Sequence, residues 1–496
     1  MLRLFIIVLF SSLTQSVCSQ EVYDIEILHS DIAISEIYNS EQVKRLVGHV
    51  RMKHKNSFID CDSATIFPSN NIEAFGNVKL RRKSTQIRGD NLQYFSVAKL
   101  AVLNNNVILT DKKSKLYCED MTYDMNHDIG YFMKGGKMVN EKTEVTSLFG
   151  TYYAKSAEML FRQNVRVNHP DYQLTSDSLL YNMKYKRSIF KTSTKIENDS
   201  GYIFCNSGWY DEQNNQSSFG RNTYIFNTNS WLLTDSIFYD KKNKKSHIYK
   251  TFEYHDTASK IHLFGDSAVM YDDDNRILAF KRPTLIIESV ENKEPTFVRG
   301  NTLDSRTVAG KKRKLVATKN VRLFNKEFQA KSDTMIYTEV DSTMILKKDP
   351  IMWHEKDQIS GKILKIQMEQ KSPKVIYVYQ EAFLAQEEDV RTHYNQVSGD
   401  TVIIYFENKN ISELTSKGSA KSIYYAKEEG KGYLGINSSQ SERMKTIFDS
   451  SKPSRVIFYD NPKATFIPAK QIDEINRYLP NFKWYDALRP KSKDDI

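Results

Sequence analysis

The cysteines and histidines are the first candidates for chemistry in this chain, because both residue types bind metals and act in catalysis. Beyond the N-terminal segment three cysteines remain, Cys61, Cys118 and Cys205. Each occupies a position of a repeated segment that a glycine or serine fills in other copies, for example Gly89 and Ser176. No Cys-x-x-Cys pair occurs, and no histidine stands at ligand spacing beside these cysteines. We therefore interpret them as small structural residues and predict no metal site.

Sequence motifs of common enzyme classes give no better support. The ten histidines are scattered, and the chain has no HExxH, GxSxG or Walker-type loop. Residues 430–435 (GKGYLG) match GxGxxG, but a dinucleotide site needs a buried strand before this motif and a helix after it. Here a charged run precedes it and a strand-like segment follows it, so we predict a β-turn. Asp272–Asp274 lacks the spaced ligands of a calcium loop and is predicted to form a hairpin turn.

An acidic residue recurs once per repeat and is the remaining catalytic candidate. Glycosidases need two carboxyl groups in unlike environments at one site, whereas these acids occupy equivalent positions. We interpret them as acceptors of hydrogen bonds from turn amides at strand ends. The chain is therefore predicted not to be an enzyme and to need no cofactor. The acids are Asp62, Asp90, Asp177, Asp235, Asp266, Asp333 and Asp400.

These residues must be positioned by a folded, strand-rich protein. The 496 residues are 40% hydrophobic and 12% aromatic, which is enough to bury a core and excludes a wholly disordered chain. The 29 tyrosines and 26 phenylalanines favour strands. A formal charge of +10 is mild evidence for an anionic partner, because many acidic residues are interspersed and a solvated mixed surface is the simpler explanation.

The first nineteen residues resemble a secretory signal peptide. A short basic start, Met1–Arg3, precedes the apolar run Leu4–Phe10, and small polar residues follow it up to Ser19. Cleavage near Val17–Ser19 is the primary interpretation, and a lipoprotein site at Cys18 is the alternative. No later apolar run is long enough for a membrane helix. We expect an exported, soluble protein of the periplasm, with association with the outer membrane as the alternative.

A repeated segment dominates the rest of the chain. It begins with a small residue, usually continues with an acid, and then alternates apolar positions up to a tyrosine, as in Gly89–Tyr94 (GDNLQY). From Cys61 to Gly265 successive copies are 28 to 31 residues apart. A second segment alternates with the first and has an Asn-Val pair after a glycine or turn, as in Gly76–Leu80 (GNVKL). Both alternate with period two, which predicts strands with one buried face.

The repeats predict an elongated, all-β architecture in which stacked units bury a common face. We divide the chain into a signal peptide (1–19), a first repeat region (20–290), a second repeat region (291–467) and a polar C-terminal tail (468–496). Glu288–Pro295 is the candidate hinge, because the repeat spacing changes there. The one helix-like stretch is Ala469–Leu479, with apolar residues at helical spacing before Pro480.

The succession of these two segments resembles the OstA/LptA family, including the N-terminal domain of LptD. The resemblance extends over about residues 40–467 and includes Asp349–Trp353 (DPIMW), Gln358–Gly361 (QISG) and Lys417–Tyr425 (KGSAKSIYY), the last of which is similar to OstA-like proteins of Bacteroidota. It implies a V-shaped β-jellyroll, or β-taco, that holds the lipid A acyl chains of lipopolysaccharide. It also implies LptC-like and LptD-like partners that stack on open edge strands, self-association through the same edges, and no nucleic-acid partner.

The function predicted from this resemblance is lipopolysaccharide binding within a bridge to the outer membrane. Acting as an adaptor, rather than as an LptA-like bridge segment, is equally compatible with the sequence. A β-solenoid that binds polysaccharide, or a secreted scaffold with a packed core, are the alternatives. Twelve residues share one strand face and are the candidate lipid-binding set. They are Val50, Met52, Val78, Leu80, Leu92, Val107, Leu109, Val165, Val167, Leu179, Val321 and Leu323.

Overall fold

The computed structural model describes residues 25–111, 114–288, 294–310, 312–369, 372–389, 392–428, 432–449 and 452–496. The chain forms two compact units: unit 1 comprises residues up to 170 together with 180–184, and unit 2 comprises 171–179 and 185–496. The predicted signal peptide, most of the candidate hinge at Glu288–Pro295 and the first two residues of the predicted turn at 430–435 lie outside the described residues. Residues 432–435 begin a strand, so for them the predicted turn was wrong.

The all-β prediction is confirmed. Within the described residues the regular elements are 38 β-strands and three short 3₁₀ helices. The strands of unit 1 are β1 (Glu26–His29), β2 (Ile32–Tyr38), β3 (Glu41–His54), β4 (Ser57–Ile66), β5 (Ile72–Arg82), β6 (Thr85–Phe95), β7 (Leu100–Asp111), β8 (Ser114–Asp124), β9 (Ile129–Phe132), β10 (Gly136–Asn140), β11 (Thr143–Ser147), β12 (Phe149–Tyr153) and β13 (Glu158–His169).

Unit 2 contains the remaining elements, except for the last residues of β14, which belong to unit 1. They are β14 (Tyr172–Asn182), β15 (Arg187–Phe190), β16 (Thr194–Asn198), β17 (Gly201–Cys205), β18 (Ser207–Asp211), β19 (Gln216–Asn227), β20 (Ser230–Asp240), β21 (Lys245–Asp256), β22 (Ile261–Tyr271), β23 (Arg276–Phe280), β24 (Thr284–Ile287), β25 (Thr296–Arg299), β26 (Thr302–Ala309), β27 (Lys312–Phe324), β28 (Phe328–Thr338), β29 (Thr343–Lys347), β30 (Ile351–His354), β31 (Asp357–Ser360), β32 (Ile363–Glu369), β33 (Ser372–Asp389), β34 (His393–Glu407), β35 (Asn410–Glu428), β36 (Gly432–Asp449), β37 (Lys452–Tyr459), β38 (Lys463–Pro468), η1 (Ala469–Gln471), η2 (Asp486–Leu488) and η3 (Lys493–Asp495).

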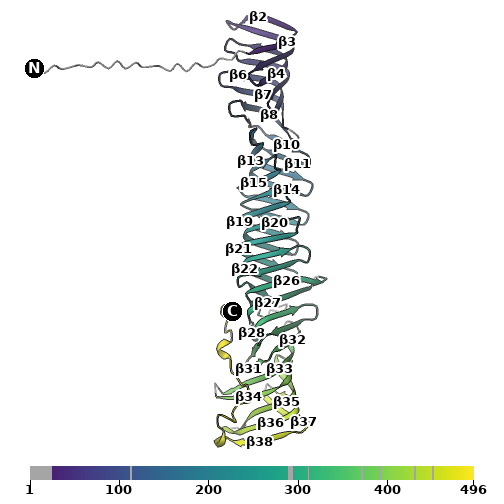
Figure 1. The fold of residues 1–496 in the computed structure, drawn as a ribbon, viewed down its shortest axis with the longest axis vertical. Coiled ribbons are helices and arrows are strands. Elements are labelled where there is room, and N and C mark those ends of the chain that lie inside the picture. The colour runs from purple at the N-terminus through teal and green to yellow at the C-terminus, as the bar shows by residue number, and fades with distance from the viewer. Residues whose placement is uncertain are drawn as a thin grey trace, which may run out of the picture. The chain divides into compact units, whose positions relative to one another are not determined.

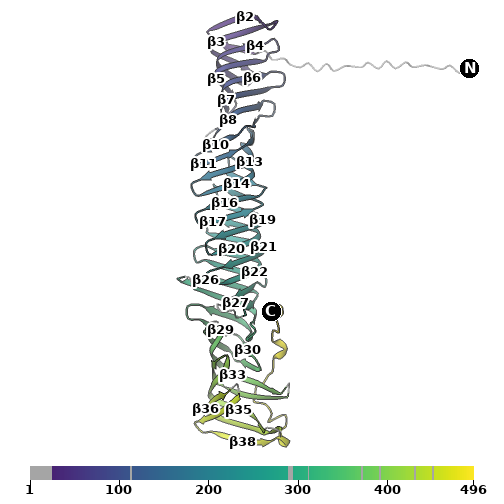
Figure 2. The same ribbon diagram turned by 180° about the vertical axis from the view of Figure 1, so that it is seen from behind.

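Within each unit the chain passes back and forth in antiparallel crossings, which we call rungs (Figures 1 and 2). A rung is either one long strand, such as β4 or β5, or two short strands in line. For example, β8 pairs with β10 along its first half and with β9 along its second half, so β9 and β10 form one rung. One repeat step of the sequence therefore holds two rungs and the two hairpin turns that join them.

Each rung bends near its middle, and the bend explains the Gly-Asn-Val segment. Gly76 and Asn77 have φ angles of 74° and 45°, in the left-handed region that favours glycine and asparagine. The register of β5 against β6 shifts at these two residues, so they form a β-bulge rather than a turn before a strand. A Cβ atom on Gly76 would lie 2.4 Å from Oδ2 of Asp62, which leaves no room for a side chain.

The recurring acids lie at this bend, and their predicted place at strand ends was wrong. Asp62 is in the middle of β4 and accepts a hydrogen bond of 2.9 Å from Nδ2 of Asn77. Asp90 accepts the equivalent bond of 2.7 Å from Asn106. These two acids are therefore structural partners of the bulge residues on the next rung.

Within Ala469–Leu479 only η1, the three residues Ala469–Gln471, is helical, so the prediction of a helix-like stretch over Ala469–Leu479 was wrong. Ile472 and Leu479 pack against a cluster on the sheet that includes Phe383, Ile423 and Ile436. Ile475 is instead 89% exposed. Ile472 and Leu479 therefore contact the sheet from an irregular segment, and the helical spacing of the apolar residues does not correspond to a helix. The predicted hairpin turn at Asp272–Asn275 is present between β22 and β23.

Candidate functional site

The twelve predicted lining residues all lie inside their units. Each is at most 3% exposed, and they come from β3, β5, β6, β7, β13, β14 and β27. Their polar neighbours Lys79, Asn91 and Gln93 are partly or fully exposed on the other face. The strand alternation therefore identified the inner face correctly. Contact of these residues with lipid stays a prediction.

In unit 1 the inner face forms one apolar row that runs straight across nine rungs. Each member pairs directly with the next across the sheet, and each is at most 3% exposed. The row consists of Met52, Ile59, Leu80, Ile87, Leu109, Leu116, Met138, Val145 and Val167. Five of these, Ile59, Ile87, Leu116, Met138 and Val145, were absent from the predicted set. They alternate as their neighbours do, and the register between rungs identifies them.

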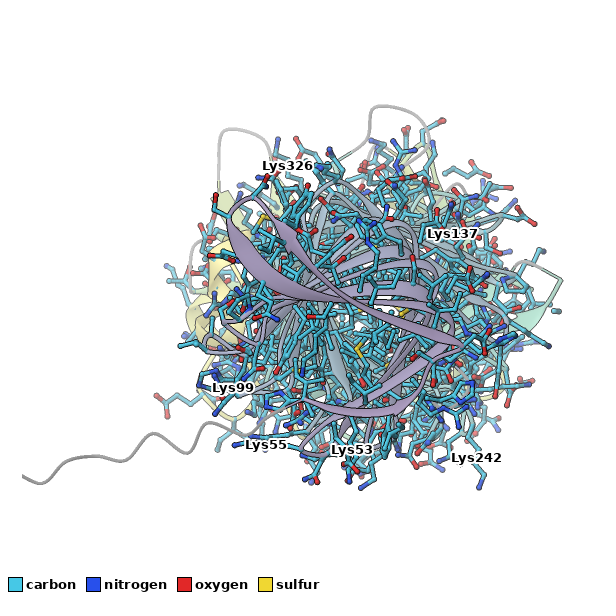
Figure 3. All side chains as sticks on the ribbon, turned by 90° about the horizontal axis from the view of Figure 1, so that it is seen from above. Lys53, Lys55, Lys99, Lys137, Lys242 and Lys326 are labelled. Atoms are coloured by element: carbon cyan, nitrogen blue, oxygen red, sulfur yellow. The ribbon has the colours of Figure 1, made fainter. Side chains whose placement is uncertain are left out.

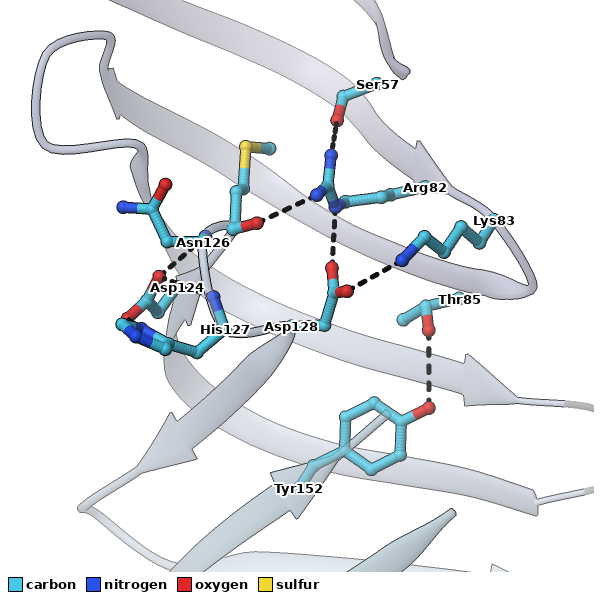
Figure 4. A network of polar contacts seen from close by, with 10 residues as sticks. Ser57, Arg82, Lys83, Thr85, Asp124, Asn126, His127, Asp128 and Tyr152 are labelled. Atoms are coloured by element: carbon cyan, nitrogen blue, oxygen red, sulfur yellow. Dashed lines mark hydrogen bonds and ion pairs between the residues drawn. The ribbon is translucent and has the colours of Figure 1, made fainter. Parts of the chain in front are cut away.

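Polar side chains close the interior where the ends of the rungs meet, and we call these cross-rim contacts the seam. Arg82 ends β5, and Asp128 lies in the turn at the opposite ends of the rungs, between β8 and β9. Arg82 Nε donates to Asp128 Oδ1 at 2.7 Å, and Lys83 Nζ donates to Oδ2 at 2.8 Å (Figure 4). Burial disfavours ionisation of Asp128, but the hydrogen bonds from Arg82 and Lys83 hold its pKa below the ordinary value.

Further seam contacts follow along unit 1. Tyr152 donates its hydroxyl to Asp111 at 3.0 Å and lies 3.3 Å from the Thr85 hydroxyl (Figure 4 shows the Thr85 contact). Asn140 Nδ2 donates to the Tyr181 hydroxyl at 3.0 Å. Burial raises the pKa of Tyr152 well above that of a free tyrosine, so this phenol stays protonated and able to donate.

The seam of unit 2 contains a deeply buried ion pair. Arg313 is 1% exposed, and its Nε donates to Oδ2 of Asp256 at 2.8 Å. The same guanidinium donates to the Ser305 hydroxyl at 2.9 Å and to the Tyr254 hydroxyl at 3.3 Å. A charge this well buried is tolerated because its donors are hydrogen-bonded.

The first rungs of unit 2 have a more open interior than the nine rungs of unit 1 that carry the apolar row. The inner side chains of Ile196, Ile203, Tyr210 and Ile225, on β16 to β19, are only half-buried. The ring of Tyr210 contacts Tyr172 with centroids 5.9 Å apart. Apolar inner side chains that water still reaches make this stretch more accessible than the apolar row of unit 1.

One inner carboxyl group is strongly perturbed. Asp357 is 6% exposed, and burial raises its pKa to about 7, although a hydrogen bond of 3.0 Å from Gln386 Nε2 opposes the rise. Nδ1 of His354 lies 4.0 Å from Asp357 Oδ2, and burial lowers the pKa of that histidine. The pair lies within the interior, where burial disfavours the charged form of both side chains.

The described residues supply no metal site. No group of three or more histidine, cysteine, aspartate or glutamate side chains in that part of the chain is placed to hold an ion. Cys61, Cys118 and Cys205 are free thiols, and burial raises the pKa of each to about 12. None of the described helices is long and apolar enough to cross a membrane.

Bent antiparallel rungs around a shared apolar interior define a repetitive, jellyroll-like class of all-β protein. Residues 23–177 match the family model described as OstA-like protein, and residues 202–372 match that of the LptA/(LptD N-terminal domain) LPS transport protein. The two matches cover about two thirds of the sequence, and the chain belongs to the OstA/LptA family. Proteins of this family are non-enzymatic, in agreement with the sequence prediction.

Solved structures include a similar, much shorter protein. LptH of Pseudomonas aeruginosa, described as the LptA homologous periplasmic component of the lipopolysaccharide transport device, is 12% identical. The match covers 28% of this chain and 93% of LptH, with a TM-score of 0.23. No curated protein sequence matches the chain.

Proposed function

We propose that the chain is a periplasmic lipopolysaccharide-binding protein and that it forms part of the bridge that carries lipopolysaccharide to the outer membrane. The observation that carries this proposal is the apolar row of unit 1, which crosses nine rungs without a polar residue and is closed by polar seam contacts. An acyl chain along such a row would gain about 0.8 kcal/mol for each buried CH₂. No catalytic group is required.

The seam is the proposed route by which acyl chains enter. The inner side chains already contact one another, so lipid can enter only if the rims separate. A typical hydrogen bond contributes only about 0.5–1.5 kcal/mol net, because water replaces it when it opens. Parting the seam should therefore cost less than disrupting the backbone ladders of the rungs. The half-buried stretch at β16 to β19 is the proposed first point of entry.

Outward basic residues fit the phosphate groups of lipid A. Lys53, Lys55, Lys99 and Lys137 project outward from unit 1 (Figure 3). Ammonium groups at a rim would bind lipid phosphates while the acyl chains occupy the interior. The proposed assignment to the periplasm rests on the signal-like N-terminus and on the family.

Partners are proposed to stack on the edge strands. In unit 1, β2 pairs with β3 along Ile32–Tyr38, and Ile32, Ile34 and Ile37 are 55%, 43% and 80% exposed. An edge with exposed apolar residues invites addition of another strand. An LptC-like or LptD-like jellyroll, or a second copy of the chain, would add strands at this end of unit 1, where the apolar row begins at Met52 and Met52 pairs with Ile27 of β1.

A structural scaffold is the second candidate, because the predicted lining residues are almost completely buried by one another. A polysaccharide-binding β-solenoid fits less well, because the described strand pairs are antiparallel rather than coiled in parallel.

Co-purification tests the proposal. The exported chain, purified without detergent, should carry lipid A detectable by mass spectrometry. Ile203→Asp places a charge on the half-open inner face and should remove most of the lipid, while Phe204→Asp on the neighbouring outer position should not. Circular dichroism verifies that both variants fold. Absence of lipid A from the wild-type protein, or equal retention in both variants, would favour the scaffold.

A further inference from the structure

The outer face of unit 2 carries a second ordered row of side chains, which we call the outer row. Its members pair directly across consecutive rungs, as the inner row does in unit 1. The first half consists of Tyr202, Phe226, Trp231, His255, His262 and Ile286. Through Phe297 and Phe324 it continues into a second half that consists of Gln329, Trp353, Gln358, Ala385, Gln396 and Ile423.

The second half of the outer row is covered by the chain's own C-terminal segment, residues 472–496, which we call the strap. Gln358 donates to the carbonyl of Lys483 at 2.7 Å and accepts from the amide of Tyr485 at 2.6 Å. Gln396 makes the same two-sided contact, at 3.0 Å to the carbonyl of Arg477 and 2.8 Å from the amide of Leu479. Glutamine side chains of the row thus bind the backbone of the extended strap.

Apolar side chains complete the contact between the strap and the second half. Trp353, on the row, is fully buried, and Phe383, two residues before Ala385 of the row, is 7% exposed. Phe482 and Trp484 of the strap pack against the cluster that contains Phe383, Ile423 and Ile436. The outer face of these rungs therefore has a core of its own, built between the sheet and the strap.

The first half of the row is aromatic as well, but the hydrogen bonds described for the strap end beside it, at Arg299 on β25, which donates to the carbonyl of Ile496. Phe226 is 36% exposed, and the neighbouring outer residues Phe204 and Leu233 are 39% and 40% exposed. The rings of Trp231 and His255 stack with centroids 3.7 Å apart and planes 11° apart. Rings stacked on one another present their edges outward, so their faces are not free to stack on sugar rings.

An acidic hollow adjoins this bare half. A cavity of about 390 Å³ lies beside Leu233 and Phe264, on the side toward the bend. Its lining includes Asp235, Glu253 and Asp266 and no basic side chain. An apolar stripe beside an acidic hollow complements a segment that carries apolar side chains and a basic one. The strap has this composition itself, with Leu479, Phe482 and Trp484 among Arg477, Lys483 and Arg489.

We propose that the bare half of the outer row docks an extended polypeptide segment of a partner protein, with apolar or aromatic side chains on the row and a lysine or arginine in the acidic hollow. Continuity with the strap-covered half carries the inference. Both halves belong to the same row of paired outer side chains, and the second half already binds an extended segment, the strap. This inference does not depend on lipid binding.

A peptide with the sequence of residues 475–491 is the probe, and the full-length chain with its strap in place is the receptor. Fluorescence anisotropy of the labelled peptide should show saturable binding. Phe226→Ser and Leu233→Ser should each weaken it about tenfold or more, since central apolar anchors dominate such interfaces. Tyr249→Ser removes an aromatic residue that is 52% exposed elsewhere on the outer face and should leave binding unchanged. Asp235→Asn should weaken peptide binding less than Phe226→Ser or Leu233→Ser does.

Three results would overturn the proposal. The first is no saturable binding, or equal affinity in all variants. The second is binding that Gln358→Ala alters and Phe226→Ser does not, which would mean that the peptide exchanges with the strap. The third is concentration-dependent self-association of the chain that Phe226→Ser abolishes, which would assign the face to a second copy. Melting temperatures of each variant separate loss of binding from loss of fold.

Discussion

The interior of unit 1 and the interior of the first rungs of unit 2 follow the same strand alternation but are closed to different degrees. Leu80 and Leu109 in unit 1 are each 1% exposed. Ile203 and Ile225 occupy equivalent inner positions of β17 and β19 and are only half-buried. Alternation therefore decides which side chains face inward, but it does not decide how tightly the interior is closed.

The rims account for part of this difference. Unit 1 has the Arg82–Asp128, Tyr152–Asp111 and Asn140–Tyr181 contacts on successive pairs of rungs. In unit 2 the buried Arg313–Asp256 pair closes the seam beyond the half-open rungs. The rim side chains thus affect closure of the interior without being part of the inner face. Substitutions can therefore change seam closure and the apolar inner face separately.

The largest expected effect is at the buried ion pair. Arg313→Ala leaves Asp256 buried without its partner and should lower the free energy of unfolding by about 3–5 kcal/mol. Arg82→Ala should cost less, because the Arg82 side chain is 19% exposed and Lys83 still pairs with Asp128. Urea denaturation of the two variants measures the difference. Equal losses would contradict the idea that burial of Arg313 makes the unit 2 ion pair more costly to break than the Arg82 contact.

The second effect compares the two interiors directly. Leu80→Ala should cost about 2–5 kcal/mol, because it leaves a cavity among fully buried neighbours. Ile203→Ala removes a side chain that water already reaches and should cost clearly less. Thermal unfolding followed by circular dichroism checks both. A larger loss at Ile203 would mean that these rungs are closed in solution.

The third effect is a pH dependence centred on Asp357, whose pKa is raised to about 7 by burial. The folded protein keeps a proton that the unfolded chain releases above about pH 4. This contribution to stability is therefore complete below about pH 4 and is lost as the pH rises toward 7, by about 1.4 kcal/mol for each pH unit in that window. Asp357→Asn should remove this slope and stabilise the protein at pH 8. If the melting temperature of Asp357→Asn changed with pH as that of the wild-type protein does, Asp357 would not be the source of the pH dependence.

The sequence predicts the inner face well because period-two alternation and burial are local properties. Val78, Leu80 and Leu92 are all inside, as their spacing indicates. The bulge at Gly76 and Asn77 was missed because a glycine followed by asparagine also begins turns, and only the pairing register separates the two cases. Arg313 and Asp256 are 57 residues apart, and the strap contacts a rung more than 120 residues earlier at Gln358. Contacts at such separations depend on how the rungs stack, which no local pattern contains.

The central claim is that the inner face, and not the outer one, holds acyl chains. A photo-crosslinking residue placed at Ile203, Leu80 or Leu109 tests the inner face, and the same residue at Phe204, Lys79 or Asn91 tests the outer face. In cells that make lipopolysaccharide, the account predicts adducts with lipid A at the inner positions, most strongly at Ile203, and none at the outer positions. Equal capture on both faces, or none on either, would contradict the account and leave a packed scaffold as the better description.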